Sequence, residues 1–285
     1  MPAKSVSVEY MIKLSISVVC YNSPLNQLQS LIDSLEISIK HLRRHYKLPV
    51  IPVFIIDNSY DLSVATELFS HDHHRLGELK VVLHRIAGHG NIGYGRAHNL
   101  ILQEIDSDFH LMLNPDVTFE EDALFRALSR MTDNEQIKAL SPNATDRHGN
   151  KQYLCKSYPS VFTLLLRGIA LDALTKLFSE RLYCYEMRDL PEDKPTEREM
   201  LLGGCFLLVE TRSLKLVNGF DERYFLYFED FDLSIRIGQL GKLVYAPEVR
   251  ITHSGGNTSS KGFWHVRRFL TSGIRFFNTH GWSFL

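Results

Sequence analysis

Strand-like and helix-like segments alternate along the N-terminal part of the chain, and this order limits the possible folds more than any other feature. The strands are predicted at residues 14–20, 50–56, 79–86 and 109–113, and the helices at residues 26–46 and 97–105. A β-α-β order predicts a sheet with parallel strands and helices on its faces. Ligands of such sheets bind beyond the carboxyl ends of the strands, so we expect the chemistry there.

The pattern is less regular after Asp116. Helices are predicted at residues 119–131, 163–178 and 230–240, and strands at residues 137–141, 201–209 and 242–251. The stretch 186–199 holds two prolines and nine charged residues. We predict that it is an exposed connector, with an active-site lid as the alternative.

Composition excludes several classes of protein. Lys and Arg number 32 and Asp and Glu 33, a net charge of −1 that gives no global field for binding nucleic acid. The four cysteines show no C-x-x-C pairing and are expected to be reduced thiols. Residues 11–20 are broken by Lys13 and suit a strand better than a signal peptide, and charges interrupt the apolar stretch 161–178 before it reaches membrane-spanning length. We therefore expect a folded, cytoplasmic protein.

A glycine-rich segment follows the third predicted strand. Residues 88–93 read G-x-G-x-x-G, but a dinucleotide fingerprint belongs after the first strand, so we reject that interpretation. The segment is either a simple turn or a place where backbone approaches a phosphorylated or nucleoside ligand. The polar neighbours Asn91, Arg96 and Asn99 favour the ligand.

Asp116 follows the fourth predicted strand within Asn114-Pro115-Asp116. One carboxylate there can hold a divalent cation whose other positions are filled by substrate phosphates and water. The alternative is that Asp116 caps the next helix.

Three acids lie among aromatic residues at the start of the helix predicted at 230–240. An apolar surrounding raises the proton affinity of a carboxylate, as a general base requires, so Glu229 and Asp230 are candidate catalytic residues. The alternative is that the acids favour the helix N-terminus through its dipole and that Asp232 pairs with Arg236.

His253 precedes two glycines at the end of the last predicted strand, and basic residues follow it. Backbone amides and cations are what a diphosphate needs, so His253 is a candidate ligand of a metal or a phosphate. The basic residues concerned are Lys261, Arg267 and Arg268.

The order of these motifs resembles the family 2 inverting glycosyltransferases, in their bacterial rhamnosyltransferase-like branch. The motifs are Cys20-Tyr21-Asn22-Ser23, Ile56-Asp57-Asn58-Ser59, the glycine-rich segment from Asn91 to Asn99, Asn114-Pro115-Asp116, Gly203-Gly204-Cys205-Phe206, Gly219-Phe220-Asp221-Glu222, Phe228-Glu229-Asp230 and His253. Any one of them is weak, whereas the whole series in order is specific.

The resemblance implies an α/β fold of the GT-A type, a Rossmann-like, mostly parallel mixed sheet flanked by helices in a single globular unit. It implies that residues 12–253 form the glycosyltransferase domain, with 12–117 binding the nucleotide sugar and 118–253 forming the acceptor-binding and catalytic half. We expect the basic and aromatic segment 254–285 to pack on or near the active site or a membrane.

Carried over to this sequence, the resemblance implies a role for each motif. Tyr21 and Asn22 line the nucleoside, Asp57 accepts a hydrogen bond from the base, and the nucleotide pocket includes Asn91, Gly93 and Asn99. Asn114 and Asp116 replace the family's Asp-x-Asp, which leaves Asp116, helped by His253, to hold Mg²⁺ or Mn²⁺. Gly203 and Gly204 give the sugar and the acceptor close access to backbone.

The implied reaction is an in-line displacement at the anomeric carbon. It needs a base on the acceptor side and charge neutralisation of the leaving nucleoside diphosphate. Asp230 matches the base, with Glu229 as second choice. The divalent cation and the residues Lys261, Arg267 and Arg268 would stabilise the diphosphate.

The expected substrates are a nucleotide sugar and a saccharide, or lipid-linked saccharide, of the bacterial cell surface. The best guess for the donor is dTDP-L-rhamnose, and UDP-hexoses are the alternative. Nucleotidyl transfer and a non-catalytic sugar-nucleotide or glycan-binding module are the competing classes. The segment 163–178 and the C-terminal aromatics can rest on an anionic inner leaflet, or they can close the core.

Overall fold

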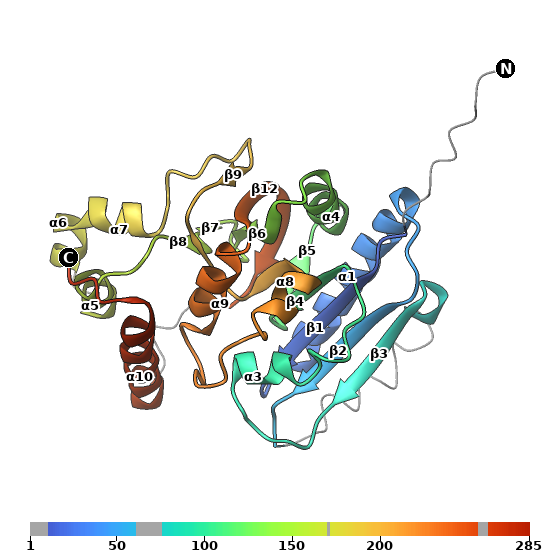
Figure 1. The fold of residues 1–285 in the computed structure, drawn as a ribbon, viewed down its shortest axis with the longest axis horizontal. Coiled ribbons are helices and arrows are strands. Elements are labelled where there is room, and N and C mark those ends of the chain that lie inside the picture. Colours follow the sequence, from blue (N-terminus) through green and yellow to red (C-terminus); the bar gives the residue numbers. More distant parts are fainter. Residues whose placement is uncertain (1–10, 61–75, 170–171, 256–261) are drawn as a thin grey trace.

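The computed structural model describes residues 11–60, 76–169, 172–255 and 262–285. The fold is built around a mixed sheet with the strand order β3-β2-β1-β4-β11-β6-β12-β5 (Figure 1). Its strands are β1 (Leu14–Cys20), β2 (Ile51–Asp57), β3 (Val81–Ile86), β4 (Phe109–Leu113), β5 (Val117–Phe119), β6 (Ile137–Thr145), β11 (Phe206–Glu210) and β12 (Lys242–His253). Shorter strands are β7 (Lys151–Gln152) on β6, β9 (Thr196–Glu197) on β12, and the separate pair β8 (Cys155–Lys156) and β10 (Leu201–Leu202).

Helices cover both faces of this sheet. They are α1 (Leu25–His45), α3 (Tyr94–Asn99), α4 (Ala123–Asp133), α5 (Val161–Ile169), α6 (Asp172–Leu177), α7 (Ser179–Tyr185), α8 (Thr211–Leu216), α9 (Glu229–Gly238) and α10 (Phe263–His280). Helices α1 and α4 pack on one face, and α3, α8 and α9 pack on the other. Helices α5, α6, α7 and α10 gather at the end of the molecule opposite β1, β2 and β3 (Figure 1).

Strand β1 shows why the sheet is two-sided. Its residues Leu14, Ile16 and Val18 point into the core formed with α1, and the intervening Ser15 and Ser17 point to the face that α3 covers. A strand buried on both faces reads as a continuous buried run, as all of β1 does.

The register of the parallel strands brings their carboxyl ends to one edge. Strand β1 pairs in parallel with β2 and with β4, so that Cys20 lies opposite Asp57 and Val18 opposite Leu113. Residues that follow these strands therefore gather at the same edge, as the β-α-β order predicted. The predicted α/β class and the mixed, mostly parallel sheet are confirmed.

Five predicted elements differ from the structure. The helix predicted at 97–105 is the shorter α3, because Gly93, at φ 97°, opens the helix earlier and i to i−3 turns follow Asn99. Phe119 lies in β5 opposite Ile251, so the next helix begins only at Ala123. The predicted helix 163–178 is two helices, α5 and α6, and Gly203-Gly204 divides the predicted strand 201–209 into β10 and β11.

The exposed connector predicted at 186–199 is the fifth difference. Met187 and Leu190 are buried against Leu202, and β9 pairs with β12. Residues of this stretch thus complete the core and extend the sheet, and only part of the stretch is an exposed loop.

Candidate active site

The turns after β1 and β2 are locked together by short hydrogen bonds. The Ser59 backbone N–H donates to Asp57 Oδ1 at 2.9 Å, and the Asn22 N–H donates to Ser59 Oγ at 2.7 Å. Asp57 is buried, with 3% of its surface exposed, whereas Tyr21 is 50% exposed. The two turns form one wall at the edge of the sheet, and Tyr21 offers an aromatic face to solvent there.

The glycine-rich segment joins this wall to the loop that precedes α9. The Tyr94 N–H donates to the Phe225 carbonyl at 3.1 Å, and Asn58 Nδ2 donates to the Gly93 carbonyl at 3.0 Å. A Cβ on Gly93 would lie 2.4 Å from the Phe225 oxygen, and its φ of 97° also favours glycine. Asn91 Oδ1 accepts from the Gly93 N–H at 3.2 Å, so Asn91 shapes this turn.

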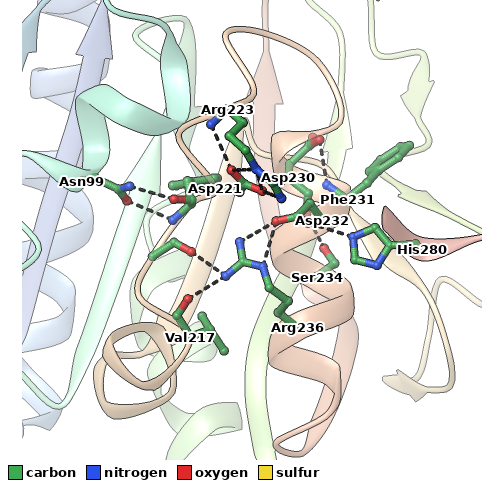
Figure 2. Close-up of polar contacts among 12 residues, drawn as sticks. Asn99, Val217, Asp221, Arg223, Asp230, Phe231, Asp232, Ser234, Arg236 and His280 are labelled. Carbon is green, nitrogen blue, oxygen red and sulfur yellow. Dashed lines mark hydrogen bonds and ion pairs between the residues drawn. The ribbon is translucent and has the colours of Figure 1, made fainter. Parts of the chain in front are cut away.

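Asn99 holds a neighbouring loop through both ends of its amide. Its Nδ2 donates to the Phe220 carbonyl at 2.8 Å, and its Oδ1 accepts from the Phe220 N–H at 2.9 Å (Figure 2). The structure therefore gives Asn99 a bracing role between α3 and this loop. Its place in a nucleotide pocket stays a prediction.

Asp116 and His253 face each other across the turn after β4. His253 Nε2 lies 3.5 Å from Asp116 Oδ1, and the Ser254 N–H donates to the Asp116 carbonyl at 2.9 Å. Asn114 lies at the same turn, where its N–H donates to the Cys205 carbonyl at 2.9 Å. Pairing of β12 with β5 brings His253 opposite Val117, beside Asp116.

Gln152 fixes the protonation of the His253 ring. Its Nε2 donates to the carbonyls of His253 and Gly255, at 2.9 and 3.2 Å, which leaves Oε1 as an acceptor 2.7 Å from His253 Nδ1. Nδ1 must therefore carry a proton. In neutral imidazole the Nε2 lone pair then faces a carboxylate oxygen, an arrangement that needs a cation or a proton between the two atoms.

The surroundings of Asp116 fit a divalent cation. Asp116 Oδ1 is buried and has no hydrogen-bond partner among the residues that the structure describes. A Cβ on Gly255 would lie 2.1 Å from Asp116 Oδ2, so only glycine leaves the carboxylate its space. Within the described ranges no group of three or more His, Cys, Asp or Glu side chains is arranged to hold a metal. One carboxylate and one imidazole match a site that substrate phosphates complete.

The turn at Gly203-Gly204 holds the Asp230 carboxylate. The Gly204 N–H donates to Asp230 Oδ2 at 3.0 Å, and the Phe231 N–H donates to Asp230 Oδ1 at 2.9 Å. Tyr94 donates its hydroxyl to the Gly204 carbonyl at 2.6 Å and so fixes the turn from the other side. A Cβ on Gly204 would lie 3.3 Å from the Tyr94 ring and 3.4 Å from the Asp230 Cβ. Gly203 donates its N–H to the Leu154 carbonyl at 3.1 Å.

Burial raises the proton affinity of both acids at the start of α9. Desolvation raises the pKa of Asp230 to about 6 against the opposing effect of its N–H donors, and desolvation with the nearby Asp230 charge raises the pKa of Glu229 to about 8. Glu229 is only 5% exposed, and its Oε2 has no partner within the described part of the chain. Asp230 is the more exposed of the two acids. A carboxylate that has a raised pKa and is still partly exposed has the properties of a general base.

Helix α10 holds these acids in a strained backbone. Tyr227 and Phe228, the two residues before Glu229, have φ of 70° and 66°, which is costly for aromatic residues. The Phe228 ring packs on Phe276 of α10 at 5.3 Å between centroids, and a Cβ on Gly273 would lie 3.3 Å from it. Aromatic packing against α10 thus offsets the strain. Helix α10 thus contacts the residue that directly precedes Glu229.

Asp232, the third acid, is structural. Arg236 Nε and Nη2 donate to its Oδ2 at 2.8 and 2.6 Å, and its Oδ1 lies 2.8 Å from His280 Nε2 (Figure 2). The predicted pairing of Asp232 with Arg236 is confirmed. The additional contact with His280 ties α9 to the far end of α10.

The basic residues predicted for the diphosphate take different positions. The Arg268 guanidinium lies over the Phe225 ring, 4.3 Å from its centroid, next to the glycine-rich segment. Arg267 is exposed on α10. Lys261 lies outside the described residues. A diphosphate role for these side chains stays a prediction.

Sequence reasoning missed Tyr94 and Gln152. The charges of Cys205, Glu229, Asp230 and Asp116 all add to desolvation in raising the pKa of Tyr94, which lies at the centre of the candidate site. Its position between two glycines was the available signal. Gln152 belongs to a two-residue strand with no motif around it, so no sequence signal marked it.

Comparisons with known proteins agree with this fold. No protein-family model matches the chain. It is 32% identical over 190 residues to the N-acetylglucosaminyl-diphospho-decaprenol L-rhamnosyltransferase of Mycobacterium tuberculosis, a match that covers 60% of this chain and 58% of that protein. It is 25% identical over 192 residues to the rhamnosyltransferase WbbL of Escherichia coli K12, covering 62% and 69%. The chain thus matches less than two thirds of the length of the mycobacterial relative.

Solved structures share the architecture at low sequence identity. GalNAc-T7 with UDP, GalNAc and Mn²⁺ superimposes with a TM-score of 0.61 at 16% identity, covering 87% of this chain and 44% of that one. The mannosyltransferase PcManGT of Pyrobaculum calidifontis with GDP-Man and Mn²⁺ gives 0.55 at 15% identity, covering 93% and 65%. Residues 1–349 of S. aureus TarS give 0.54 at 14% identity, covering 94% and 74%. The chain has the GT-A glycosyltransferase fold and resembles bacterial rhamnosyltransferases in sequence.

Proposed function

We propose that this chain transfers a sugar from a nucleoside diphosphate donor to a saccharide acceptor, with inversion at the anomeric carbon. The observation that carries the proposal is the Asp230 carboxylate. It is held by the Gly204 N–H at 3.0 Å, and its pKa is raised by burial. The charges of Asp230 and of Asp116, the neighbour of His253, both raise the pKa of Tyr94 and of Cys205, so the two acids lie around the same side chains. This pairing of a base with a diphosphate-binding carboxylate is what an in-line glycosyl transfer needs.

Asp230 is the proposed base. It accepts the proton of the attacking acceptor hydroxyl as that oxygen bonds to the anomeric carbon, and the bond from this carbon to the diphosphate oxygen breaks. The nucleoside diphosphate leaves with the bonding electron pair. Glu229 is less suited to this role because it is more deeply buried, but its proximity raises the proton affinity of the pair.

Asp116 and His253 are the proposed ligands of a divalent cation, Mg²⁺ or Mn²⁺. Such a cation supplies positive charge to the diphosphate as its negative charge grows. Gln152 keeps the His253 Nε2 lone pair directed at the site, and Gly255 leaves room beside the carboxylate. Mn²⁺ in the GalNAc-T7 and PcManGT structures supports this assignment.

The proposed donor is dTDP-L-rhamnose and the proposed acceptor a lipid-linked saccharide of the bacterial cell surface. The names of the mycobacterial and E. coli relatives support rhamnose, and the mycobacterial name includes a diphospho-lipid. Tyr21, Asn22 and Asp57 form the wall where the nucleoside would bind, and Asn91 shapes the adjoining turn. UDP-hexoses are the competing donors.

Thermal unfolding against a panel of nucleotide sugars, with and without Mn²⁺, tests donor binding. A ligand at about 100 times its Kd adds about 2.7 kcal/mol of stability, which is several degrees in Tm. We expect dTDP-L-rhamnose to raise the Tm only with Mn²⁺ in the wild type, and Asp116→Ala to lose the shift. The reaction is then measured as sugar transfer to a GlcNAc-diphospholipid, after subtraction of donor hydrolysis in the absence of acceptor. Binding without transfer would favour a sugar-nucleotide-binding module.

Peripheral membrane contact, at the cytoplasmic face of the inner membrane, is part of the proposal. No helix in the described part of the chain is long and apolar enough to cross a bilayer. On α10, Phe269, Phe276 and Phe277 pack inward, so they serve the core rather than a membrane. The exposed apolar residues of α10 are Phe263, Trp264, Val266, Leu270 and Ile274. Sedimentation with anionic vesicles at low salt tests this contact, and no binding would refute it.

A further inference from the structure

A cavity of about 530 Å³ is lined by residues of α5, α7 and the C-terminal segment. These elements lie at the end of the molecule opposite β1, β2 and β3 (Figure 1). The motifs described above do not include it. Its lining combines hydroxyl groups, one arginine, one glutamate and apolar side chains. The C-terminal segment closes one side, because the carbonyls of Ser283 and Phe284 accept from the first two N–H groups of α5.

Arg181 supplies the positive charge of this cavity. Its Nη1 donates to Ser160 Oγ at 3.3 Å and to Thr163 Oγ1 at 3.2 Å, and both hydroxyl side chains are buried. The nearby Arg167 and Arg188 each pair with Glu186. Among the described residues Arg181 forms no ion pair, although Glu180 also lines the cavity. The guanidinium also lies over the Phe162 ring, 5.4 Å from its centroid. A guanidinium that contacts two hydroxyls and an aromatic ring, without a carboxylate partner, suits a phosphate or diphosphate.

The rim of the cavity is apolar. Leu177 is 74% exposed and Leu285 is 83% exposed, and Phe178 lies beside them in the lining. Exposed leucines beside the Arg181 guanidinium fit a ligand that has an anionic group and an apolar chain. A free nucleotide or a saccharide does not need such a rim.

One wall of the cavity leads toward the proposed base. Ser157 follows β8, and β8 pairs with β10, which runs into the Gly203-Gly204 turn that holds Asp230. Tyr185 lines the cavity, and the Asp230 charge contributes to raising its pKa to about 12 after the larger effect of burial. Lys156, which precedes the lining residue Ser157, lowers the pKa of Asp230 by its charge. The Ser157 N–H donates to the Tyr185 carbonyl at 2.9 Å, so these residues form one wall. A sugar attached to a diphosphate in the cavity would extend along this wall toward Asp230.

We propose that this cavity binds the diphosphate of a lipid-linked acceptor, with Arg181 as its anion ligand and Leu177 and Leu285 against the start of the lipid chain. The proposal rests on the proposed function, because it assigns the acceptor class to a place near the base.

Calorimetric titration with geranyl diphosphate tests the site without requiring transfer. We expect the wild type to bind this probe and Arg181→Gln to bind it about tenfold or more weakly, the loss typical of one charge-assisted hydrogen-bonding group. Arg181→Lys should recover part of the affinity. Arg212→Gln, which removes an exposed charge on α8, is the matched control and should bind as the wild type does.

Three further titrations separate the sources of the ligand. Inorganic pyrophosphate should bind more weakly than geranyl diphosphate, and equal, Arg181-dependent binding of both would refute the lipid part of the proposal. UDP and dTDP with Mn²⁺ should bind wild type and Arg181→Gln equally, because their site is elsewhere. If these nucleotides fail to bind either protein, the proposed function fails; if only geranyl diphosphate fails, the cavity assignment fails.

Leu177→Glu provides a second variant if Arg181→Gln does not fold. The side chain is exposed, so the substitution places a negative charge at the rim without removing core packing. We expect weaker binding of geranyl diphosphate and a higher KM for a lipid diphosphate acceptor, with unchanged KM for the nucleotide sugar. Unchanged affinity and KM in this variant would overturn the proposal.

Discussion

The two sides of the candidate site are built differently. On the side proposed to bind the nucleotide, Asp57 ends one parallel strand and Asn22 follows the next, and the register of the two strands brings them together. On the catalytic side, Asp230 depends on the Gly204 turn and on α10, which are distant in the sequence. A regular sheet is enough to bring the ends of parallel strands together. The position of the acids depends in addition on a strained turn that α10 stabilises. We therefore expect substitutions in α10 to affect the catalytic side first.

Buried titratable groups also differ between the two sides. Below the sheet near α3, Ser17 Oγ lies 2.7 Å from His98 Nδ1 and 2.8 Å from His110 Nε2, and burial lowers the pKa of both histidines. On the catalytic side burial raises the pKa of Glu229 and Asp230. In both places burial favours the neutral form of the side chain. Raising the pH therefore destabilises the protein through the buried carboxyls, and lowering the pH destabilises it through the buried histidines.

Asp230→Asn tests the catalytic side most strongly. Removing the base should lower kcat by about a thousandfold, within the usual contribution of general base catalysis, while the donor-induced Tm shift stays. Steady-state transfer kinetics and thermal unfolding measure the two effects. Asp193→Asn in an exposed loop is the matched control. Normal turnover of the Asp230→Asn variant would show that another group is the base.

Gln152→Leu tests the support of the proposed cation ligand. Without the acceptor for Nδ1, the His253 ring can change its tautomer. Loss of a side chain that hydrogen-bonds to a metal ligand typically weakens metal affinity by about ten- to a hundredfold. Titration of Mn²⁺ in the presence of nucleoside diphosphate measures the affinity. Gln103→Leu at the surface should leave it unchanged. Equal Mn²⁺ affinity in the Gln152 variant would contradict the assignment of His253.

Glu229→Gln tests the pH dependence of the catalytic side. A carboxyl whose folded pKa is raised to about 8 contributes stability at low pH that is lost as the pH rises through that value. The variant should therefore have a Tm several degrees above the wild type at pH 9 and a small difference at pH 5. Thermal unfolding at both pH values measures this, with exposed Glu135→Gln as control. If the Tm of the variant and that of the wild type change equally between the two pH values, Glu229 does not have a raised pKa.

His110→Gln tests the opposite dependence on the nucleotide side. The pKa of His110 is lowered to about 3 by burial, whereas an unfolded histidine has a pKa of about 6.5. The buried neutral ring therefore contributes its full stability above pH 6.5, the unfolded pKa. Below that pH the free energy of unfolding falls by up to about 1.4 kcal/mol per pH unit until the pH reaches about 3. Urea unfolding at pH 7 and pH 5 should show a smaller fall in His110→Gln. His148→Gln, at an exposed position, should keep the wild-type dependence, and an equal fall in all three proteins would contradict the prediction.

Local sequence patterns predicted the strands whose ends carry the candidate residues. The apolar runs that became β1 and β4 matched to the residue, because a strand buried on both faces must be continuously apolar. The motifs at Asp57, Asp116 and Asp230 follow from those ends and from the start of α9. Local pattern was enough wherever a residue's position depends on its own strand or helix.

The contacts that hold those residues could not be predicted from local sequence patterns. Gln152 reaches His253, 101 residues away, and α10 supports Phe228 from the end of the chain. Met187 and Leu190 became core residues because β9 pairs with β12, although their segment is highly charged. Such contacts depend on which elements meet in space, and the free energy of that meeting comes from packing and desolvation that no local pattern encodes.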